Sequence, residues 1–196
     1  MIASIIISVS YLIGSIPFGL VGKVFFNIRD PRTFGSKNIG ATNILRSGNK
    51  KAAAFTLFFD MFKGFLAVLI ASYVDKDIAY LAILSVVFGH IFPVYLLFKG
   101  GKGVATFLGA LVSYSAVVGS LTLLAWITVF YFTRKSSVAG ISAIVLSNFF
   151  LFVFCDDTSI KFSLLLLSIF ILFKHSENIK RLLNREEFSF QGRDKN

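Results

Sequence analysis

The chain has 196 residues, of which 56% are hydrophobic and only 15% are charged, and its formal net charge is +10. A soluble domain of this length is typically about a quarter charged, so the composition indicates that lipid is the main solvent and argues against a nucleic-acid partner for the positive charge. The single cysteine, Cys155, excludes an internal disulfide and argues against structural zinc. The length suits a single domain over residues 1–196.

Three long apolar stretches in the first half of the chain each predict a transmembrane helix. A helix needs about 20 mainly apolar residues to cross the hydrocarbon core of a bilayer. The stretches of this length are Ile2–Phe26, Ala52–Val74 and Ile78–Phe98. No basic segment precedes the first of them, so it does not resemble a secretory signal peptide and we expect it to remain in the protein.

The second half of the chain predicts four shorter spans. Gly103–Thr133 holds 31 residues, most of them apolar. One helix of this length would be about 46 Å long, well beyond a hydrocarbon core of ~30 Å. A turn among the serines and the glycine of 113–120 is therefore expected to divide the stretch into two helices. Val138–Val153 and Ser159–Phe173 complete a count of seven.

The basic residues are distributed unevenly between the two sides that seven spans would create. Segments 27–51, 99–102, 134–137 and 174–196 fall on one side and hold 6, 2, 2 and 6 Lys or Arg residues. Because cytoplasmic loops carry an excess of Lys and Arg, we expect this side to face the cytoplasm. The sequence thus predicts an all-α, polytopic integral membrane protein with seven transmembrane helices, an external N-terminus and a cytoplasmic C-terminus.

Ionisable and helix-breaking residues lie within three of the spans. Asp60 and Lys63 are three residues apart and can pair on a helix, either as functional groups at membrane depth or as a purely structural pair. His90, ahead of Pro93, suits a site residue near a kink or an ordinary core histidine. The sequence GSIPFG at 14–19 predicts close helix packing or a kink in the first span.

Two glycine-rich polar segments on the predicted cytoplasmic side suit phosphate binding. Residues 34–53, FGSKNIGATNILRSGNKKAA, combine hydroxyls, amides and one arginine with glycines that let the backbone approach a ligand. Residues 98–106, FKGGKGVAT, place Lys99 and Lys102 beside glycines at the start of a predicted helix, where free N–H groups favour anions. Composition alone suits an ordinary basic loop and a tight membrane turn as well. The second segment is not a Walker A loop, because Leu96 occupies the first glycine position.

Two further polar segments complete the same side. In residues 133–140, TRKSSVAG, Ser136 and Ser137 are expected to cap the following helix. In residues 174–187, KHSENIKRLLNREE, His175 and Asn178 recur at helical spacing and can face one site. An amphipathic helix lying on the membrane surface would show the same pattern.

Read together, these stretches resemble one family, the acyl-phosphate-dependent glycerol-3-phosphate acyltransferases of bacterial membranes. The matching stretches touch nearly the whole chain: GSIPFG (14–19), GSKNIGATNILR (35–46), the DxxKG pattern (60–64), GHIFPVYLLFKGGKGVAT (89–106), the turn at 134–138 and KHSENIKRLL (174–183). The resemblance implies seven spans, a location in the bacterial inner (plasma) membrane and an active site that faces the cytoplasm.

The resemblance also implies which residues handle the substrates. Its substrate-binding positions, for the phosphates of glycerol 3-phosphate and acyl phosphate, fall on Ser36, Asn38, Thr42, Arg46, Gly101, Lys102 and Gly103. Its catalytic positions fall on His90, Ser137, His175 and Asn178. Lys37 and Arg185 depart from the pattern, because the family often has glycine at both, and Glu187 stands at the acidic position that follows the second.

The implied reaction is attack by the 1-hydroxyl of glycerol 3-phosphate on the carbonyl of acyl phosphate, which releases phosphate and forms 1-acyl-glycerol 3-phosphate. The chain lacks a GxSxG nucleophile motif. It also lacks the HxxxxD pattern of thioester-using glycerolipid acyltransferases, since Tyr95 and Lys180 stand five residues after the two histidines. Catalysis would then rest on positioning and charge stabilisation, with the proton passing to His175 or to a substrate phosphate.

No cofactor or metal is implied. The implied partners are the two substrates, membrane lipid and the soluble enzyme that makes acyl phosphate, and they do not include nucleic acid. An organic-anion transporter and a structural membrane subunit are the alternatives from other classes of protein. A transporter usually carries its site at the midplane and often shows repeats, whereas this chain gathers its motifs on one face. A structural subunit would leave the two glycine-rich segments without a purpose.

Overall fold

The computed structural model describes residues 1–190, and every regular element in this range is helical. The predicted all-α fold is therefore confirmed for the described chain. The helices form two compact units, the first covering Met1–Ala116 (unit 1) and the second beginning at Val117 (unit 2).

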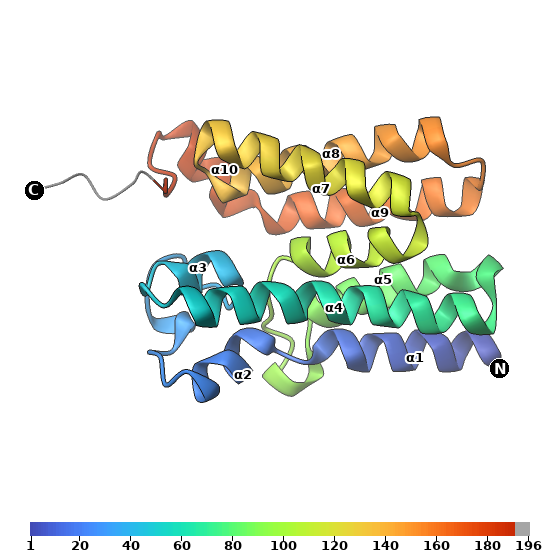
Figure 1. The fold of residues 1–196 in the computed structure, drawn as a ribbon, viewed down its shortest axis with the longest axis horizontal. Coiled ribbons are helices and arrows are strands. Elements are labelled where there is room, and N and C mark those ends of the chain that lie inside the picture. Colours follow the sequence, from blue (N-terminus) through green and yellow to red (C-terminus); the bar gives the residue numbers. More distant parts are fainter. Residues whose placement is uncertain (191–196) are drawn as a thin grey trace, which may run out of the picture. The chain divides into compact units, whose positions relative to one another are not determined.

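Unit 1 consists of long helices that lie side by side, with two short helices packed near the start of α4 (Figure 1). Helix α4 packs most extensively on α6, and α1 packs most extensively on α5. The helices are α1 (Ile2–Ser15), α2 (Phe18–Phe25), α3 (Ala41–Leu45), α4 (Lys50–Val74), α5 (Ala79–Ile91) and α6 (Val104–Tyr114), with 3-10 turns η1 (Pro31–Thr33), η2 (Lys76–Ile78) and η3 (Val94–Leu96).

Unit 2 contains three long helices and a short one, namely α7 (Ala116–Thr133), α8 (Ser136–Phe154), α9 (Thr158–Lys174) and α10 (Ser176–Leu183). Helix α9 packs on α8, and the chain bends by 56° between α9 and α10. The predicted capping of α8 by Ser136 and Ser137 is wrong. Both residues lie inside the helix, and Lys135 takes the N-cap position without a side-chain capping bond.

The count of membrane spans is only partly decided by helix length. Among the described residues, five helical stretches are long and apolar enough to cross a membrane, or six if the bent pair α9–α10 is one span. The five are Ile2–Phe25, Lys50–Val74, Lys76–Leu96, Ala116–Thr133 and Ser136–Phe154. Helix α6 has 11 residues and is about 16 Å long, which is too short to cross alone. The predicted division of Gly103–Thr133 is confirmed, because the chain is extended at Ser115 between α6 and α7. Gly119 and Ser120, also considered for this turn, lie inside α7.

Proline interrupts two of the predicted spans. The predicted interruption at GSIPFG is found, since α1 ends at Ser15 and α2 begins at Phe18, on either side of Pro17. The predicted third span, Ile78–Phe98, corresponds to the helical stretch Lys76–Leu96, within which α5 ends at Ile91 and η3 follows Pro93. A proline disfavours helical backbone in the residue before it, so the Pro93 ring stops α5.

Glycines make the closest helix contacts of unit 1. Gly64 of α4 lies against the carbonyl of Thr106 in α6, and Gly109 of α6 lies against the carbonyl of Met61 in α4, so that a β-carbon at either glycine would overlap backbone. Gly14 of α1 meets a carbonyl of α5 in the same way. Small residues of this kind let helices approach closely in membranes, where packing replaces the hydrophobic effect as the force between them.

We expect Gly109→Ala to lower the free energy of unfolding by about 3 kcal/mol or more, because the rigid backbone at Met61 cannot make room for a methyl group. Thermal unfolding in detergent measures the loss. The control is Gly22→Ala, where a β-carbon would meet only the side chains of Phe55 and Thr56, at 3.2 and 3.3 Å. Equal stability of the two variants would contradict this account of the contact between α4 and α6.

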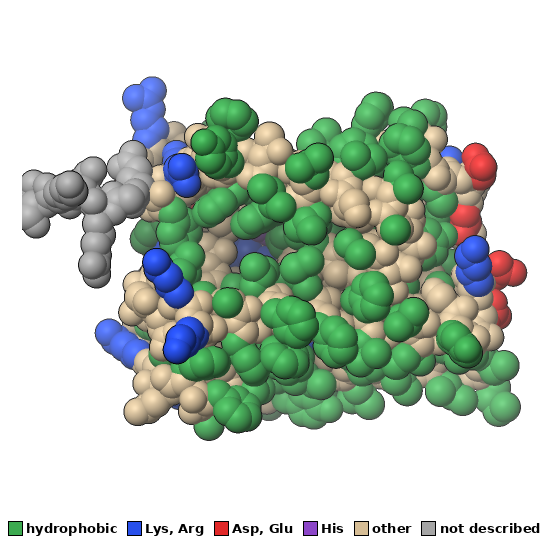
Figure 2. Space-filling view, viewed as in Figure 1, with side chains coloured by type: hydrophobic (Ala, Val, Ile, Leu, Met, Phe, Trp, Pro, Cys, Tyr) green, Lys and Arg blue, Asp and Glu red, His purple; other side chains and the backbone are tan. Residues whose placement is uncertain are grey.

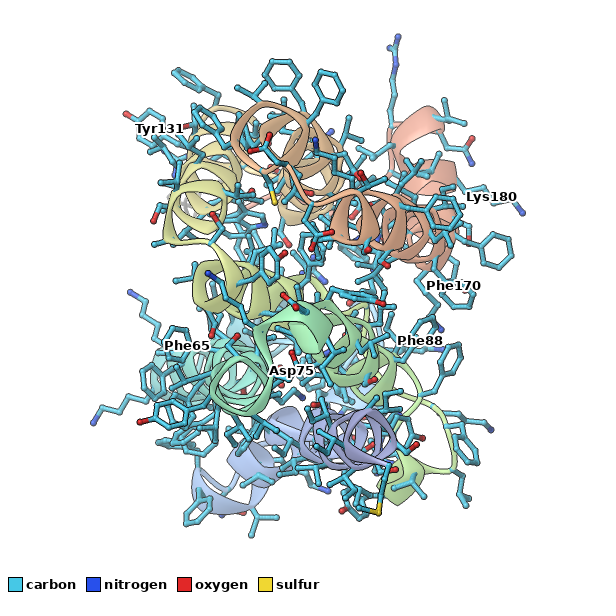
Figure 3. All side chains as sticks on the ribbon, turned by 90° about the vertical axis from the view of Figure 1, so that its right-hand side faces the viewer. Phe65, Asp75, Phe88, Tyr131, Phe170 and Lys180 are labelled. Atoms are coloured by element: carbon cyan, nitrogen blue, oxygen red, sulfur yellow. The ribbon has the colours of Figure 1, made fainter. Side chains whose placement is uncertain are left out.

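The exposed flanks of the helices are mostly apolar, and the exposed charges lie towards helix ends (Figure 2). Figure 2 shows hydrophobic side chains over the helix flanks on the face in view. Acidic residues gather at helix junctions within each unit, at Asp75–Asp77 before α5 and at Asp156–Asp157 before α9. Figure 3 shows Tyr131 at the outer side of the helices of unit 2, and its exposed fraction is 62%. An apolar flank of this kind suits contact with lipid.

Candidate functional site

Asn43 organises the glycine-rich loop between α2 and α4. Its side chain is buried, and its Nδ2 donates to the carbonyls of Pro31 (2.7 Å) and Asn38 (2.9 Å). Its Oδ1 accepts the backbone N–H of Ser36 at 2.9 Å. One amide thus joins three stretches of the loop, and it fixes the backbone on which the predicted phosphate ligands stand.

The loop places the four predicted ligands of residues 36–46 around this amide. Ser36 is held through its own N–H, as above, and Asn38 Oδ1 accepts the N–H of Gly40 at 2.8 Å. Arg46 follows α3 directly, and its Nη1 lies 3.5 Å from Asn43 Oδ1. Thr42 lies within α3, and both Thr42 and Arg46 are half-buried. Hydroxyl, amide and guanidinium groups therefore gather at one end of unit 1.

A second polar cluster lies among broken helices in the middle of unit 1. Helix α1 ends at Ser15, α5 ends at Ile91 and α6 begins at Val104, and such ends leave backbone groups without helical partners. Within a membrane these groups need partners in the protein, because no water is available there. Two of the partners are side chains of α1, since Tyr11 Oη donates to the Phe92 carbonyl at 2.7 Å and Ser15 Oγ lies 3.4 Å from the Val94 N–H.

The predicted pairing of Asp60 with Lys63 is confirmed and belongs to this cluster. Lys63 Nζ lies 2.7 Å from Asp60 Oδ1, and both side chains are almost fully buried. The same ammonium donates to the Ile16 carbonyl at 2.8 Å, just past the end of α1. A positive charge at a helix C-terminus interacts favourably with the helix dipole, so Lys63 stabilises the break between α1 and α2.

His90 connects this ion pair to α6. Its Nδ1 lies 3.0 Å from Thr106 Oγ1 and 3.5 Å from Asp60 Oδ1, and the ring is buried. Its backbone carbonyl accepts the N–H of Gly101 at 3.1 Å. His90 therefore contacts α4, the first turn of α6 and the turn that precedes α6.

The turn at Gly100–Gly103 is packed tightly against α5. A β-carbon at Gly101 would overlap the His90 ring, and Gly103 has a φ of +86°, which favours glycine. Lys102, the predicted phosphate ligand between them, is half-buried and directly precedes the N-cap of α6. The two glycines are thus explained by packing, and the turn presents Lys102 at a helix N-terminus, where an anion is favoured.

In unit 2, His175 occupies the bend between α9 and α10. It ends α9 and precedes Ser176, the first residue of α10, and its ring is buried. Its Nδ1 lies 2.8 Å from the Ile171 carbonyl. A carbonyl can only accept, so Nδ1 carries the proton and Nε2 of the neutral ring has the lone pair that can take a proton.

Glu187 joins the other predicted residues of unit 2. Its two carboxylate oxygens accept from Asn178 Nδ2 at 2.7 Å and from Arg181 Nε at 2.9 Å. Burial alone would raise the pKa of Glu187, but the hydrogen bonds from Asn178 and Arg181, with the nearby Ser137 hydroxyl, hold that pKa below its ordinary value. The buried carboxylate is therefore ionised at neutral pH and orients the Asn178 amide.

The segment after α10 folds back onto unit 2. The Phe190 N–H donates to the Arg134 carbonyl at 2.8 Å, which ties the segment to the turn before α8. The Phe190 ring contacts Phe130, and the Arg181 guanidinium lies over the Phe188 ring. Ser137, in the first turn of α8, is brought near Glu187 by this return of the chain.

Both departures from the family pattern fall at left-handed backbone. Lys37 has a φ of +56° and Arg185 a φ of +61°. Glycine reaches this region without a steric penalty, whereas other residues pay roughly 1–2 kcal/mol. The preference for glycine at these positions is therefore conformational. Arg185 still makes the turn that brings Glu187 back to Asn178.

Glu187→Gln should lower the free energy of unfolding by about 2 kcal/mol at neutral pH, because Arg181 loses a charged acceptor that is buried. It should also lower activity about tenfold, because Asn178 loses its fixed orientation. The control is Glu186→Gln, since Glu186 is the exposed neighbour. Because the folded pKa is depressed, the stabilisation is present above the ordinary value of 4.5 and is lost as the pH falls further. An unfolding temperature of Glu187→Gln equal to wild type at pH 7 would contradict the assignment.

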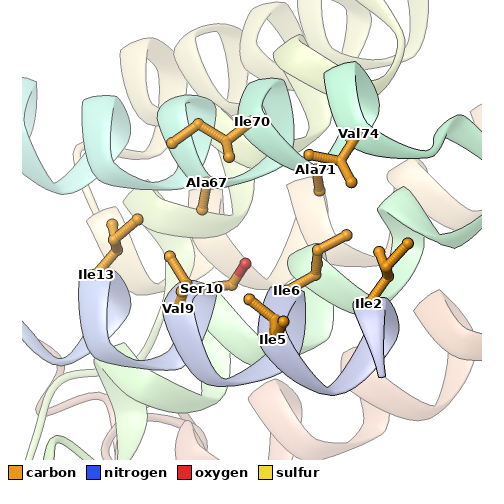
Figure 4. A pocket seen from close by; sticks show the side chains of 10 residues that line it. All are labelled: Ile2, Ile5, Ile6, Val9, Ser10, Ile13, Ala67, Ile70, Ala71 and Val74. Carbon is orange, nitrogen blue, oxygen red and sulfur yellow. The ribbon is translucent and has the colours of Figure 1, made fainter.

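A cavity between α1 and α4 is not suited to phosphate. It has a volume of about 190 Å³ and is lined by Ile2, Ile5, Ile6, Val9, Ser10, Ile13, Ala67, Ile70, Ala71 and Val74 (Figure 4). The Ser10 hydroxyl is its only polar side-chain group, so an anion there would lose its hydration without replacement. In residues 1–190, no three His, Cys, Asp or Glu side chains are placed to hold a metal ion.

The structure thus divides the predicted site residues between the two units. Ser36, Asn38, Thr42, Arg46, His90, Gly101, Lys102 and Gly103 belong to unit 1, and Ser137, His175 and Asn178 belong to unit 2. Sequence reasoning did not select Asn43, Thr106 or Glu187 as site residues. Asn43 and Thr106 both stand within matching stretches, at 35–46 and 89–106, so a sequence signal was present for each of them.

Comparison with known proteins gives consistent matches over nearly the whole chain. The sequence model of the family described as glycerol-3-phosphate acyltransferase matches residues 4–185. A glycerol-3-phosphate acyltransferase of Paraburkholderia phymatum is 41% identical over 93% of this chain and 90% of its own length. One from Bartonella quintana is 42% identical over 95% of this chain and 92% of its own length.

Two crystal structures resemble the fold. Both are of PlsY (YgiH), an integral membrane glycerol 3-phosphate acyltransferase. The glycerol 3-phosphate form has a TM-score of 0.90 and 37% identity, and the alignment covers 96% of each chain. The lysophosphatidic acid form has a TM-score of 0.87 and 36% identity, over 96% of this chain and 95% of that one.

Proposed function

The chain belongs to the glycerol-3-phosphate acyltransferase family, and we propose that it transfers a fatty acyl group from acyl phosphate to the 1-hydroxyl of glycerol 3-phosphate. The oxygen of that hydroxyl attacks the acyl carbonyl, the bond to phosphate breaks, and 1-acyl-glycerol 3-phosphate and inorganic phosphate are the products. This would be the first step of phospholipid synthesis in a bacterium.

The observation that carries the proposal is the similarity to PlsY in two forms. One form is named for glycerol 3-phosphate and the other for lysophosphatidic acid, and these are the acceptor and the product of the proposed transfer. Acyl phosphate as donor is supported by the missing HxxxxD and GxSxG patterns. An acyl phosphate is a mixed anhydride with a good leaving group, so it needs no covalent acyl-enzyme.

We assign the predicted residues to two tasks. Cationic, hydroxyl and amide groups bind the two phosphates, from Ser36, Asn38, Thr42, Arg46, Gly101, Lys102 and Gly103. His175 and Asn178 orient the attacking hydroxyl, with His90 and Ser137 in support. His175 Nε2 is suited to accept the hydroxyl proton, because Nδ1 is committed to a backbone carbonyl.

The donor test is an assay of the purified protein in detergent with glycerol 3-phosphate as acceptor. We expect turnover with acyl phosphate and none with acyl-CoA. Turnover with acyl-CoA alone would refute the proposed donor, and the absence of turnover with either would refute the proposed reaction. The soluble enzyme that makes acyl phosphate is the expected partner, and its addition should support turnover from that enzyme's own substrate.

We also propose seven spans in a bacterial inner membrane, with the N-terminus outside and the site facing the cytoplasm. The bent pair α9–α10 would be one of the two spans beyond the five long ones. The other would be α6, which at 11 residues would have to lean on neighbouring helices to reach across. A reporter after Asn196, which lies outside the described residues, should then be cytoplasmic. A reporter at Asp157, between α8 and α9, should be external. An external C-terminal reporter would overturn this topology.

A further inference from the structure

Three residues enclose the imidazole of His90 in the middle of unit 1. Asp60 Oδ1 and Thr106 Oγ1 face its Nδ1, at 3.5 and 3.0 Å. On the opposite side of the ring, Gly101 lies so close to Nε2 that a β-carbon there would overlap it. The backbone carbonyl of His90 also accepts the Gly101 N–H. The ring is thus held between α4, α6 and the turn that carries Lys102.

The hydrogen bond from Lys63 to the Ile16 carbonyl explains why a lysine is buried here, but it does not explain why an aspartate is buried beside it. A buried ion pair in a span is costly, and apolar residues of similar volume are often as stable. Asp60, however, also faces His90, which an apolar side chain could not hold. A carboxylate oxygen 3.5 Å from Nδ1 favours a proton on that nitrogen by charge attraction and leaves Nε2 facing the turn.

We propose that Asp60 is a positioning residue for acyl transfer, acting through His90 on the Gly100–Gly103 turn and so on the position of Lys102. Lys63 pairs with Asp60 at 2.7 Å and holds it in place, and Thr106 contacts the same imidazole nitrogen from α6. The inference rests on the proposed function, because Lys102 is taken there as a phosphate ligand. Asp60 itself touches no substrate in this scheme.

The test uses two independent ways to release the ring. Thr106→Val removes one hydroxyl with little change of shape. Asp60→Asn combined with Lys63→Met removes the carboxylate without leaving an unpaired buried charge. Lys102→Ala first identifies the substrate whose KM depends on Lys102. Thr106→Val and the Asp60→Asn/Lys63→Met protein should each raise the KM for that same substrate about tenfold or more, because a small misplacement of a binding group weakens binding strongly. Thr106→Ser should restore a normal KM, since it restores the hydroxyl.

A double-mutant cycle separates positioning from general destabilisation. If Asp60 and Thr106 act through Lys102, adding either variant to Lys102→Ala should lower kcat/KM little further, because the group that they position has already been removed. The matched control is Thr56→Val, another buried threonine of unit 1, whose hydroxyl donates only within its own helix, to the Ala52 carbonyl. It should keep wild-type kinetics.

Three outcomes would overturn the proposal. The first is normal KM values in Thr106→Val and in the Asp60→Asn/Lys63→Met protein. The second is a loss of kcat/KM in these variants that multiplies fully with the loss caused by Lys102→Ala. The third is a lowered unfolding temperature of the variants with an unchanged KM of their folded fraction. A wild-type protein without acyltransferase activity would instead refute the proposed function and this inference with it. An active wild type with normal variants would refute the inference alone.

Discussion

Arg46→Lys should lower kcat/KM for acyl transfer by about a hundredfold while the protein still folds. The guanidinium is planar and offers a fork of donors to two phosphate oxygens, which a lysine cannot copy even though it keeps the charge. Arg46 stands at the end of α3, beside the Asn43 amide that fixes the loop, so its position is set by the backbone. Contacts to charge that develops in the transition state are often worth roughly 3–4 kcal/mol.

The matched control for Arg46→Lys is Arg29→Lys. Arg29 is an exposed arginine of unit 1 that donates to Thr33 Oγ1 at 3.0 Å, outside the predicted site. Steady-state kinetics with each substrate varied in turn measure both variants, and thermal unfolding shows whether they fold.

Lys102→Ala should show a loss of kcat/KM of similar size to that of Arg46→Lys, because one cation near the two phosphates disappears. Near-normal kinetics in Arg46→Lys and Lys102→Ala would remove both residues from the site.

His175→Gln should lose activity by about a hundredfold or more. The hydrogen bond from Nδ1 to the Ile171 carbonyl fixes the orientation of the ring and so the position of Nε2. Glutamine cannot place a proton acceptor of the same basicity at that position. A general base loses activity when it is protonated, as the pH falls. Wild-type kcat/KM should therefore decline on the acid side.

The pH profile of His175→Gln identifies the proton acceptor. If the acid limb disappears with the histidine, His175 is the general base. If activity falls but the limb remains, a substrate phosphate accepts the proton, because its second pKa is about 6. Ser176→Ala is the control, since Ser176 is the exposed neighbour at the start of α10. Wild-type kcat/KM in His175→Gln would exclude the histidine from the reaction.

Local patterns in the sequence were enough to predict the helices and the family. The length and spacing of the apolar stretches gave the class of the fold, the division of Gly103–Thr133 and the break at Pro17. The spacing of Asp60 and Lys63 gave their ion pair. These features depend on residues within a few turns of one another, and helical periodicity and proline sterics act at that range.

The tertiary structure decided what holds the candidate site together. It assigned Asn43 to the loop, Glu187 to Asn178 and Arg181, and Asp60 with Thr106 to His90. It also showed that Pro93 ends α5 early, which leaves room for the turn that carries Lys102. Asp60 and His90 are 30 residues apart, and nothing in either local sequence selects the other. The sequence by itself determined which polar groups are present and on which helices they stand. Their partners were decided by the tertiary structure, because a polar side chain needs a hydrogen-bond partner in the protein only once packing of separate helices has buried it.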